Sequence, residues 1–293
     1  YPATLVIGDV IKAFESKRYD PSECVIAITQ TGGQCRASNY LPMLKKALVD
    51  AGYADVPVIS ITFGDDLGNL QPAFKVNWVE VLPIAIRAVL YSDCISKFYY
   101  ASVVRETSKG AALRLREEYL QKGATLIERK QSNRLYNYLA LAAKDFDAIC
   151  EKKTLPKVGV VGEIYLKFNS FAHRNIVDWF VEQKIEVDPP ILLNFFLQSF
   201  VNRKSKLQSN IEEKRFSDLF MNVFFKIVQS QISKVNKATS AFKYFTPFNT
   251  DIFKESEKVK TIVPLNAQFG EGWLLPAEII SYVENGVTHI VSL

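Results

Sequence analysis

The sequence predicts an α/β protein with two Rossmann- or flavodoxin-like parallel-sheet domains and a helical block between them. Two observations lead to this prediction. The apolar runs Val25–Thr29 and Lys157–Gly162 each lead into a glycine-bearing loop and then a helical pattern, as in α/β units. Residues 77–153 show helical periodicity alone. Because 293 residues are enough for two cores, we place the domains at 1–154 and 155–293.

The first predicted domain begins as helix, strand, helix and strand. Apolar residues repeat at helical spacing over Leu5–Phe14, and the buried strand Val25–Thr29 follows. Helix Asn39–Ala51 is expected to end at Gly52, since glycine is favoured just past a helix C-terminus. Strand Val56–Ile61 completes a strand–helix–strand unit, which implies parallel pairing with a right-handed crossover.

The helical block contains three predicted segments. They cover residues 78–100, residues 109–122 with an end at Gly123, and residues 132–150. We interpret the block as a cap or inter-domain arm, and Thr154-Leu155-Pro156 marks its end.

The second predicted domain opens with the strand Lys157–Gly162 and the loop Glu163–Asn169. Helices and strands then alternate, and the longest helix has a broad apolar face. The predicted elements are a helix at 176–180, a strand at 185–187, helices at 192–200, 211–235 and 276–284, and a final strand at 288–293.

Composition narrows the class of protein. Apolar residues make up 48% and charged residues 23%, as in soluble globular proteins. The net charge of +5 is modest, and Lys and Arg are spread among Asp and Glu, so nothing supports nucleic-acid binding. The most apolar stretch, Trp78–Tyr91, is interrupted by charges and falls short of the roughly 20 residues of a membrane span. We therefore expect a cytoplasmic protein with no membrane or nucleic-acid partner.

The four cysteines are far apart and form no CxxC pair, so they do not indicate a disulfide framework. Cys24, Cys94 and Cys150 fit the common role of small buried hydrophobes. Cys35 differs, because its neighbours are Gly, Gln and Arg. It is a candidate nucleophile or metal ligand, and alone it can supply only one of several thiolates to a cluster.

Three glycine-bearing loops follow predicted strands or turns: Thr31–Cys35, Gly162–Glu163 and Gly270–Trp273. Each is either a turn in which glycine supplies a positive φ or part of a cleft. Polar side chains in and beside these loops favour a cleft between the two domains; they are Gln30, Arg36, Asn39, Glu163, Lys167, Asn169 and Glu271. The sequence has no P-loop or dinucleotide fingerprint, and with two histidines it has no His-rich metal site.

Several separated motifs, in one order, carry a family resemblance. They are Tyr1-Pro2 with Gly8-Asp9, Thr29–Arg36, Pro156–Lys167 and Gly270–Leu275. In these motifs the chain resembles proteins related to 2-hydroxyacyl-CoA dehydratases and their activases. More narrowly, it is similar to the C-terminal part of the very large acyl-CoA dehydratase activase-related proteins. The resemblance covers essentially the whole chain, although Ser170 and His173 depart from the family's Asn-Pro-Phe-Ala-Asn run.

This resemblance implies an iron–sulfur cluster, of the 4Fe-4S type, in the full-length protein. An ATP-hydrolysing activase, in the same or a separate chain, would inject one electron, and an acyl-CoA-type small molecule would receive it and lose its hydroxyl group as a ketyl radical. Cys35 would be the metal ligand, and the other cofactor-binding residues would be Gln30, Gly32, Gly33 and Arg36. The substrate cleft would be formed by Asn39, Glu163, Lys167, Asn169, Glu271 and Trp273.

Three functional hypotheses follow. In the first, the chain is a piece of a dehydratase-like lyase or reductase system used in anaerobic metabolism, inactive on its own because family members carry further cysteines just beyond Tyr1 and Leu293. The alternative is a non-catalytic ligand-binding or docking module of a CoA-activase-related protein. The third is a thiol hydrolase using Cys35, which has no nearby histidine in the sequence to support it.

Overall fold

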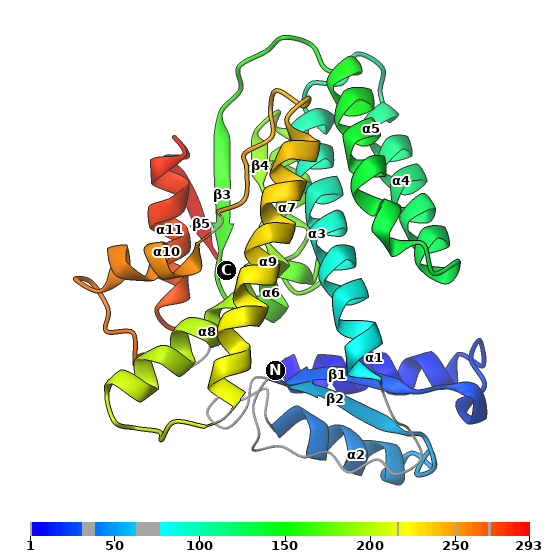
Figure 1. Cartoon of the computed structure of the whole chain (residues 1–293). Helices are drawn as coiled ribbons and strands as arrows, with labels where there is room; N and C mark the ends of the chain where they lie inside the picture. The colour runs from blue at the N-terminus through cyan, green and yellow to red at the C-terminus, as the bar shows by residue number, and fades with distance from the viewer. Residues whose placement is uncertain (1, 31–38, 63–76, 216, 250, 269–270) are drawn as a thin grey trace. The chain divides into compact units, whose positions relative to one another are not determined.

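The computed structural model describes residues 2–30, 39–62, 77–215, 217–249, 251–268 and 271–293 (Figure 1). It confirms a mixed α/β protein with two small sheets, and every described strand pair is parallel. The chain divides into two compact units. Unit 1 consists of residues 1–77 with 268–270, and unit 2 of residues 78–267 with 271–293.

Unit 1 has the order helix, strand, helix, strand. Its elements are α1 (Pro2–Glu15), a short 3-10 helix (Pro21–Glu23), β1 (Ile26–Gln30), α2 (Tyr40–Asp50) and β2 (Val58–Thr62). The predicted parallel pairing is confirmed, with Ile26 opposite Val58 and Gln30 opposite Thr62. Gly52 follows α2 with a φ of 82°, the left-handed conformation that glycine adopts without strain. The described core of unit 1 consists of Phe14, Leu41, Leu44, Leu48, Val56 and Val58.

Unit 2 is larger and mostly helical. Its elements are α3 (Trp78–Val103), α4 (Ala111–Glu128), the 3-10 helix η3 (Ser132–Arg134), α5 (Leu135–Ala148), β3 (Lys157–Val161), α6 (Ile164–Phe168), α7 (Ile176–Glu182), β4 (Glu186–Asp188), α8 (Leu192–Gln208), α9 (Ser217–Thr239), α10 (Ile252–Val259), α11 (Leu274–Glu284) and β5 (His289–Ser292). The predicted strands at 157–162, 185–187 and 288–293 therefore form one parallel sheet, in the order β4-β3-β5.

The strand order of this sheet creates a switch point. From β3 the chain first crosses to β4 on one side and later returns to β5 on the other side of β3. The connection that leaves the carboxyl end of β3 therefore runs to one side of the sheet, and the connection that leaves the neighbouring strand β4 runs back to the other side. In open α/β sheets, ligands bind in the crevice outside the strand ends at such a point.

Helices α3, α4 and α5 belong to the core of unit 2. Phe98 of α3 packs on Phe146 of α5, with ring centroids 5.5 Å apart, and on Phe242 beyond α9, at 5.1 Å. Buried side chains of α8, α9 and α11 join the same hydrophobic cluster. The helices thus share a core with the later part of the chain, and do not form a separate arm. The boundary predicted at residue 154 falls within this unit.

Two local predictions are wrong for identifiable reasons. Helix α4 does not end at Gly123, because this glycine lets α4 approach α3 closely: a Cβ there would lie 2.7 Å from Cε1 of Tyr91. The expected loop at 163–169 contains helix α6. The Glu163 carboxylate caps this helix by accepting a hydrogen bond from the Leu166 amide at 3.0 Å.

Further differences concern the later helices. Helix α9 begins at Ser217 and not at Ile211, and α10 is not predicted. Asp251 caps α10 by accepting from the Phe253 amide at 3.1 Å.

Candidate functional site at the carboxyl ends of β3 and β4

Four charged residues form what we call the strand-end cluster: Glu163, Lys167, Glu271 and Glu278. Glu163 follows the end of β3, and α6 carries Lys167 one helical turn further, with its amide donating to the Glu163 carbonyl at 2.9 Å. The Lys167 ammonium lies 3.3 Å from Oε2 of Glu278 on α11, and both side chains are buried. Glu271, also buried, precedes α11.

Burial controls the protonation of this cluster. It raises the pKa of Glu271, and the nearby Glu163 adds to the effect while Lys167 opposes it. Burial also raises the pKa of Glu278, again against the attraction of Lys167. Two buried carboxyl groups therefore share a single ammonium group, so the cluster retains a proton at pH values where an exposed glutamate has lost it.

Beside Lys167 lies a cavity of about 180 Å³ at the carboxyl end of β4. Its lining comes from α3, from α6 and α7 with the loop between them, and from the end of β4. The lining residues are Ser96, Tyr100, Lys167, Phe168, Ser170, His173, Val177, Asp178, Val187, Pro189 and Pro190. The strand-end cluster and the cavity together make up the candidate site.

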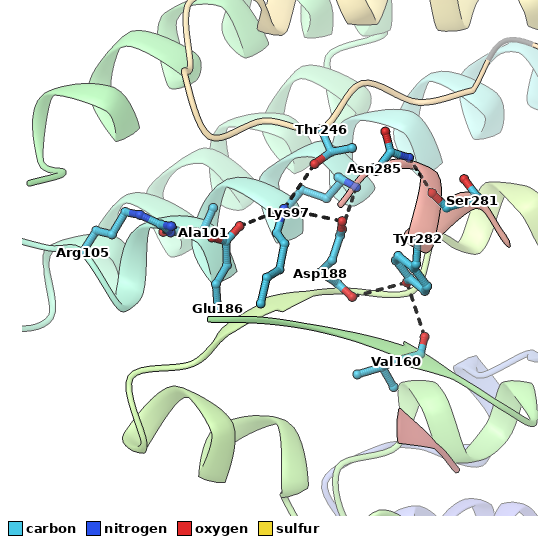
Figure 2. Close-up of polar contacts among 11 residues, drawn as sticks. Lys97, Ala101, Arg105, Val160, Glu186, Asp188, Thr246, Ser281, Tyr282 and Asn285 are labelled. Carbon is cyan, nitrogen blue, oxygen red and sulfur yellow. Dashed lines mark hydrogen bonds and ion pairs between the residues drawn. The ribbon is translucent and has the colours of Figure 1, made fainter. Parts of the chain in front are cut away.

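A buried ion network fixes β4 against α3 (Figure 2). Glu186 and Asp188 are two residues apart on the strand, so their side chains project to one face. Asp188 pairs with Lys97 at 2.8 Å, and Glu186 pairs with Arg105 at 2.6 Å. Lys157 of β3 also pairs with both carboxylates, at 3.0 Å and 3.7 Å.

The attraction of these cations determines the charge state of Asp188. Burial pushes its pKa upward, but the ammonium groups of Lys97 and Lys157 outweigh burial and hold the pKa below its ordinary value. The strand that ends at the cavity is therefore tied to α3 by charged pairs.

Helix α11 packs tightly on the same sheet. The Tyr282 hydroxyl lies 3.4 Å from the Val160 carbonyl and 3.3 Å from the Asp188 carbonyl, within reach of both strands (Figure 2). A Cβ at Gly159 would lie 2.7 Å from Cδ2 of the Tyr282 ring, so glycine is needed for this approach. The position of Glu278 relative to β3 follows from this packing.

The predicted cleft residues have different environments. Glu163, Lys167 and Glu271 lie close together, although only Glu163 follows a strand: Lys167 is on α6, and in the described part of the chain Glu271 follows α10 and precedes α11. Asn169 instead shapes its own loop: Oδ1 accepts from the Ala172 amide at 2.9 Å, and Nδ2 donates to the Tyr165 hydroxyl at 3.0 Å. Asn39 is exposed at the start of α2 in unit 1 and makes no side-chain cap bond.

Trp273 is a core residue, contrary to its predicted place in the cleft. Its side chain is fully buried, and its indole N–H donates to Oδ1 of Asn202 at 2.7 Å. Because Asn202 satisfies the indole N–H inside the protein, the position of Trp273 after the glycine pair does not indicate a binding role.

Most of the predicted cofactor loop lies outside the described residues. This applies to Gly32, Gly33, Cys35 and Arg36, while Gln30 is placed by its backbone at the end of β1. Their assignment to a cofactor stays a prediction.

The three described cysteines do not fit an iron–sulfur cluster. Cys94 is fully buried in the helical core, which raises its thiol pKa well above the ordinary value. Cys150 donates to the Phe146 carbonyl at 3.2 Å, and Cys24 lies in unit 1. Within the described ranges, no group of three or more His, Cys, Asp or Glu side chains could hold a metal ion.

Some site residues are not identified from the sequence. Glu278 could have been found from the sequence, because a carboxylate among apolar residues in the middle of helix Leu274–Glu284 needs a partner when it is buried. Ser96 and Tyr100 could not have been identified from the sequence, because their place in the cavity depends on how α3 packs on β4.

The helices of the described segments include none that is long and apolar enough to cross a membrane.

Comparisons with models of protein families, with curated proteins and with solved structures gave no match.

Proposed function

We propose that this chain is part of an iron–sulfur protein of the 2-hydroxyacyl-CoA dehydratase type. In this proposal it takes part in ATP-coupled, low-potential electron transfer to an acyl-CoA or a similar small molecule in the cytoplasm. An ATP-hydrolysing activase is its partner, and its two parallel sheets are parts of flavodoxin-like domains. The order of the sequence motifs supports the assignment.

One structural observation supports the proposal most directly. Glu163 and Lys167 belong to one motif and Glu271 to another, more than a hundred residues later, yet all three meet beyond the end of β3. Motifs that are unrelated in function have no reason to place ionisable side chains in one buried cluster. Perturbed ionisable groups at a strand end are typical of functional sites.

The cluster also has a suitable chemistry for dehydration. A departing hydroxyl group leaves more readily when a nearby acid gives it a proton. Glu271 and Glu278 are buried carboxyl groups with raised pKa values, and Lys167 orients Glu278 through their ion pair. We assign proton delivery to Glu271, because Glu278 is the partner of Lys167 in the ion pair. The described residues supply no ligand set for an iron–sulfur cluster, so Cys35 is the one iron ligand that we propose from this chain.

Anaerobic reconstitution of the full-length protein with iron and sulfide tests the assignment. We expect Cys35→Ala to reduce the bound iron and the cluster absorbance. Cys24→Ala is the matched control, because Cys24 lies near the other end of β1 in the same unit. Unchanged iron content and spectrum in Cys35→Ala would show that the proposed ligand is wrong.

The second candidate is a ligand-binding or docking module without its own redox centre. It is favoured by the described residues, which form a cavity but no metal-ligand group. Equilibrium binding of a 2-hydroxyacyl-CoA to the iron-free chain distinguishes the candidates. Binding without iron that Cys35→Ala leaves unchanged supports the module, whereas binding that appears only after reconstitution supports the iron–sulfur protein.

A further inference from the structure

The cavity beside Lys167 is the size of a single ring. Its volume of about 180 Å³ is close to the roughly 150 Å³ of an apolar cavity that accepts benzene. Sites for drug-sized ligands are larger, on the order of 300–1,000 Å³. The cavity therefore fits one ring with its substituents, and any larger remainder of a ligand would stay outside.

Apolar and ring-shaped side chains make up much of the wall. Tyr100 of α3, Phe168 of α6 and Val187 of β4 come from three separate elements, and Pro189 and Pro190 follow β4. Because the Asp93 carboxylate of α3 accepts from the Leu192 and Leu193 amides at 3.4 Å and 3.2 Å, the start of α8 just after the prolines is held in place. A wall of this kind is in place before a ligand binds, and it favours a ligand with a flat apolar face.

Unused hydrogen-bonding groups converge on the same cavity. Ser96, Tyr100 and Ser170 each bring a hydroxyl that hydrogen-bonds to no protein group in the described part of the chain, and a hydroxyl can both donate and accept. Asp178 adds a carboxylate acceptor.

His173 adds a directed donor. Its Nδ1 accepts from the Ile176 amide at 3.2 Å, so the neutral imidazole carries its proton on Nε2 and can donate it to a ligand. Donors and acceptors are therefore both available around an apolar slot.

The charge of the cavity does not call for an anion. The Lys167 ammonium is matched by Glu278 at 3.3 Å, and Asp178 brings a negative charge to the lining. We propose that this cavity binds one neutral heteroaromatic ring of nucleobase size, between its apolar walls and with hydrogen bonds to Ser96, Tyr100 and His173. Phe168, which lines the cavity and is 46% exposed, offers further aromatic surface for the outer part of such a ligand.

Binding of adenine and adenosine to the full chain, by calorimetry or ligand-observed NMR, tests this proposal. We expect saturable binding of both probes in the millimolar range or tighter. Ser96→Phe fills the cavity and should abolish binding. Ser92→Phe is the matched control, because Ser92 is exposed one turn earlier on α3, and it should bind like the wild type.

A second variant keeps the test decisive if Ser96→Phe does not fold. Tyr100→Phe removes one hydroxyl and should weaken binding about 2- to 10-fold, as expected for one hydrogen bond. Absence of saturable binding to the wild type, or wild-type affinity in Tyr100→Phe, would overturn the proposal. So would tighter binding of benzoate than of adenine, since benzoate is an anionic ring with acceptors only. None of these results depends on iron, so they are separate from the test of Cys35.

Discussion

Two strand–loop–helix segments of this chain follow the same sequence pattern but differ in their surroundings. The segment from β1 to α2 belongs to unit 1, whose described core is a small set of aliphatic residues and Phe14. The segment from β3 to α6 belongs to unit 2, whose core draws on helices from α3 to α11. Among the described residues, burial in unit 2 perturbs ionisable groups beside the second of these segments, Glu271 and Glu278.

Ion pairs show the same contrast. In unit 1 the Lys46–Asp50 pair is a solvated pair on α2, with side chains 75% and 60% exposed. In unit 2 the Lys97 and Asp188 side chains are 7% and 4% exposed. Exposed pairs contribute little to stability, whereas breaking a buried pair leaves a charge without compensation.

The largest expected effect is on this buried pair. Asp188→Ala leaves Lys97 buried beside the hydrophobic cluster, and we expect it to lower the free energy of unfolding of unit 2 by about 3–5 kcal/mol. The matched change Asp50→Ala should cost about 0.3–0.5 kcal/mol. Chemical denaturation of both variants measures the difference. Equal effects would contradict the contrast between the units.

A core truncation tests whether the small core is separate. Leu44 is fully buried in unit 1, and Leu44→Ala should cost about 2–5 kcal/mol. Since the units have separate hydrophobic clusters, we expect faster amide hydrogen exchange in α1 and α2 with little change in α3–α5. Hydrogen-exchange mass spectrometry checks this, and equal loss of protection throughout unit 2 would argue against two units.

Two glycines should respond with opposite signs. Gly159→Ala forces a Cβ against the Tyr282 ring and should destabilise unit 2 by about 1–3 kcal/mol. Gly8→Ala meets no atom within 4 Å in helix α1 and should stabilise unit 1 by about 0.5–1 kcal/mol. Thermal unfolding of each variant gives the sign. Stabilisation by Gly159→Ala would mean that α11 does not pack on β3 as described.

The last expected effect depends on pH. Burial raises the pKa of Asp93 to about 7, against the opposing amides of α8 and the charge of Lys97. A carboxyl group with a raised folded-state pKa stabilises the fold below its ordinary pKa near 3.8, and this stability is lost as the pH rises toward 7. The Asp93→Asn side chain keeps an oxygen that can accept a hydrogen bond from the amides at the start of α8, but it cannot ionise.

We therefore expect Asp93→Asn to lose less stability than the wild type between pH 4 and pH 7. The difference in slope should reach at most about 1.4 kcal/mol per pH unit. Denaturant midpoints of both proteins at several pH values measure it, and parallel pH profiles would show that Asp93 does not titrate in this range.

Much of the fold is predictable from local pattern. Short apolar runs identify β1, β2 and β3, and the helices between strands imply their parallel pairing. Glu163 and Lys167 meet because they are one helical turn apart along α6, whereas their proximity to Glu271 depends on how the segment before α11 packs.

The remaining features depend on packing between distant segments. Gly123 looks like a helix end but allows contact with Tyr91, and Trp273 follows a loop but is itself buried and donates to Asn202. Ser96 and Tyr100 become cavity residues only because α3 crosses β4, almost ninety residues later in the chain. Periodicity reports the burial of a residue but does not identify the segment that buries it.

The central claim is that the carboxyl ends of β3 and β4 in unit 2 bind the small molecule. Hydrogen-exchange mass spectrometry with and without lactyl-CoA, a 2-hydroxyacyl-CoA, tests it most directly. We predict slower exchange in residues 163–178 and 189–193, and loss of this protection in Lys167→Met. Protection confined to unit 1, or the same protection in Lys167→Met, would contradict the claim.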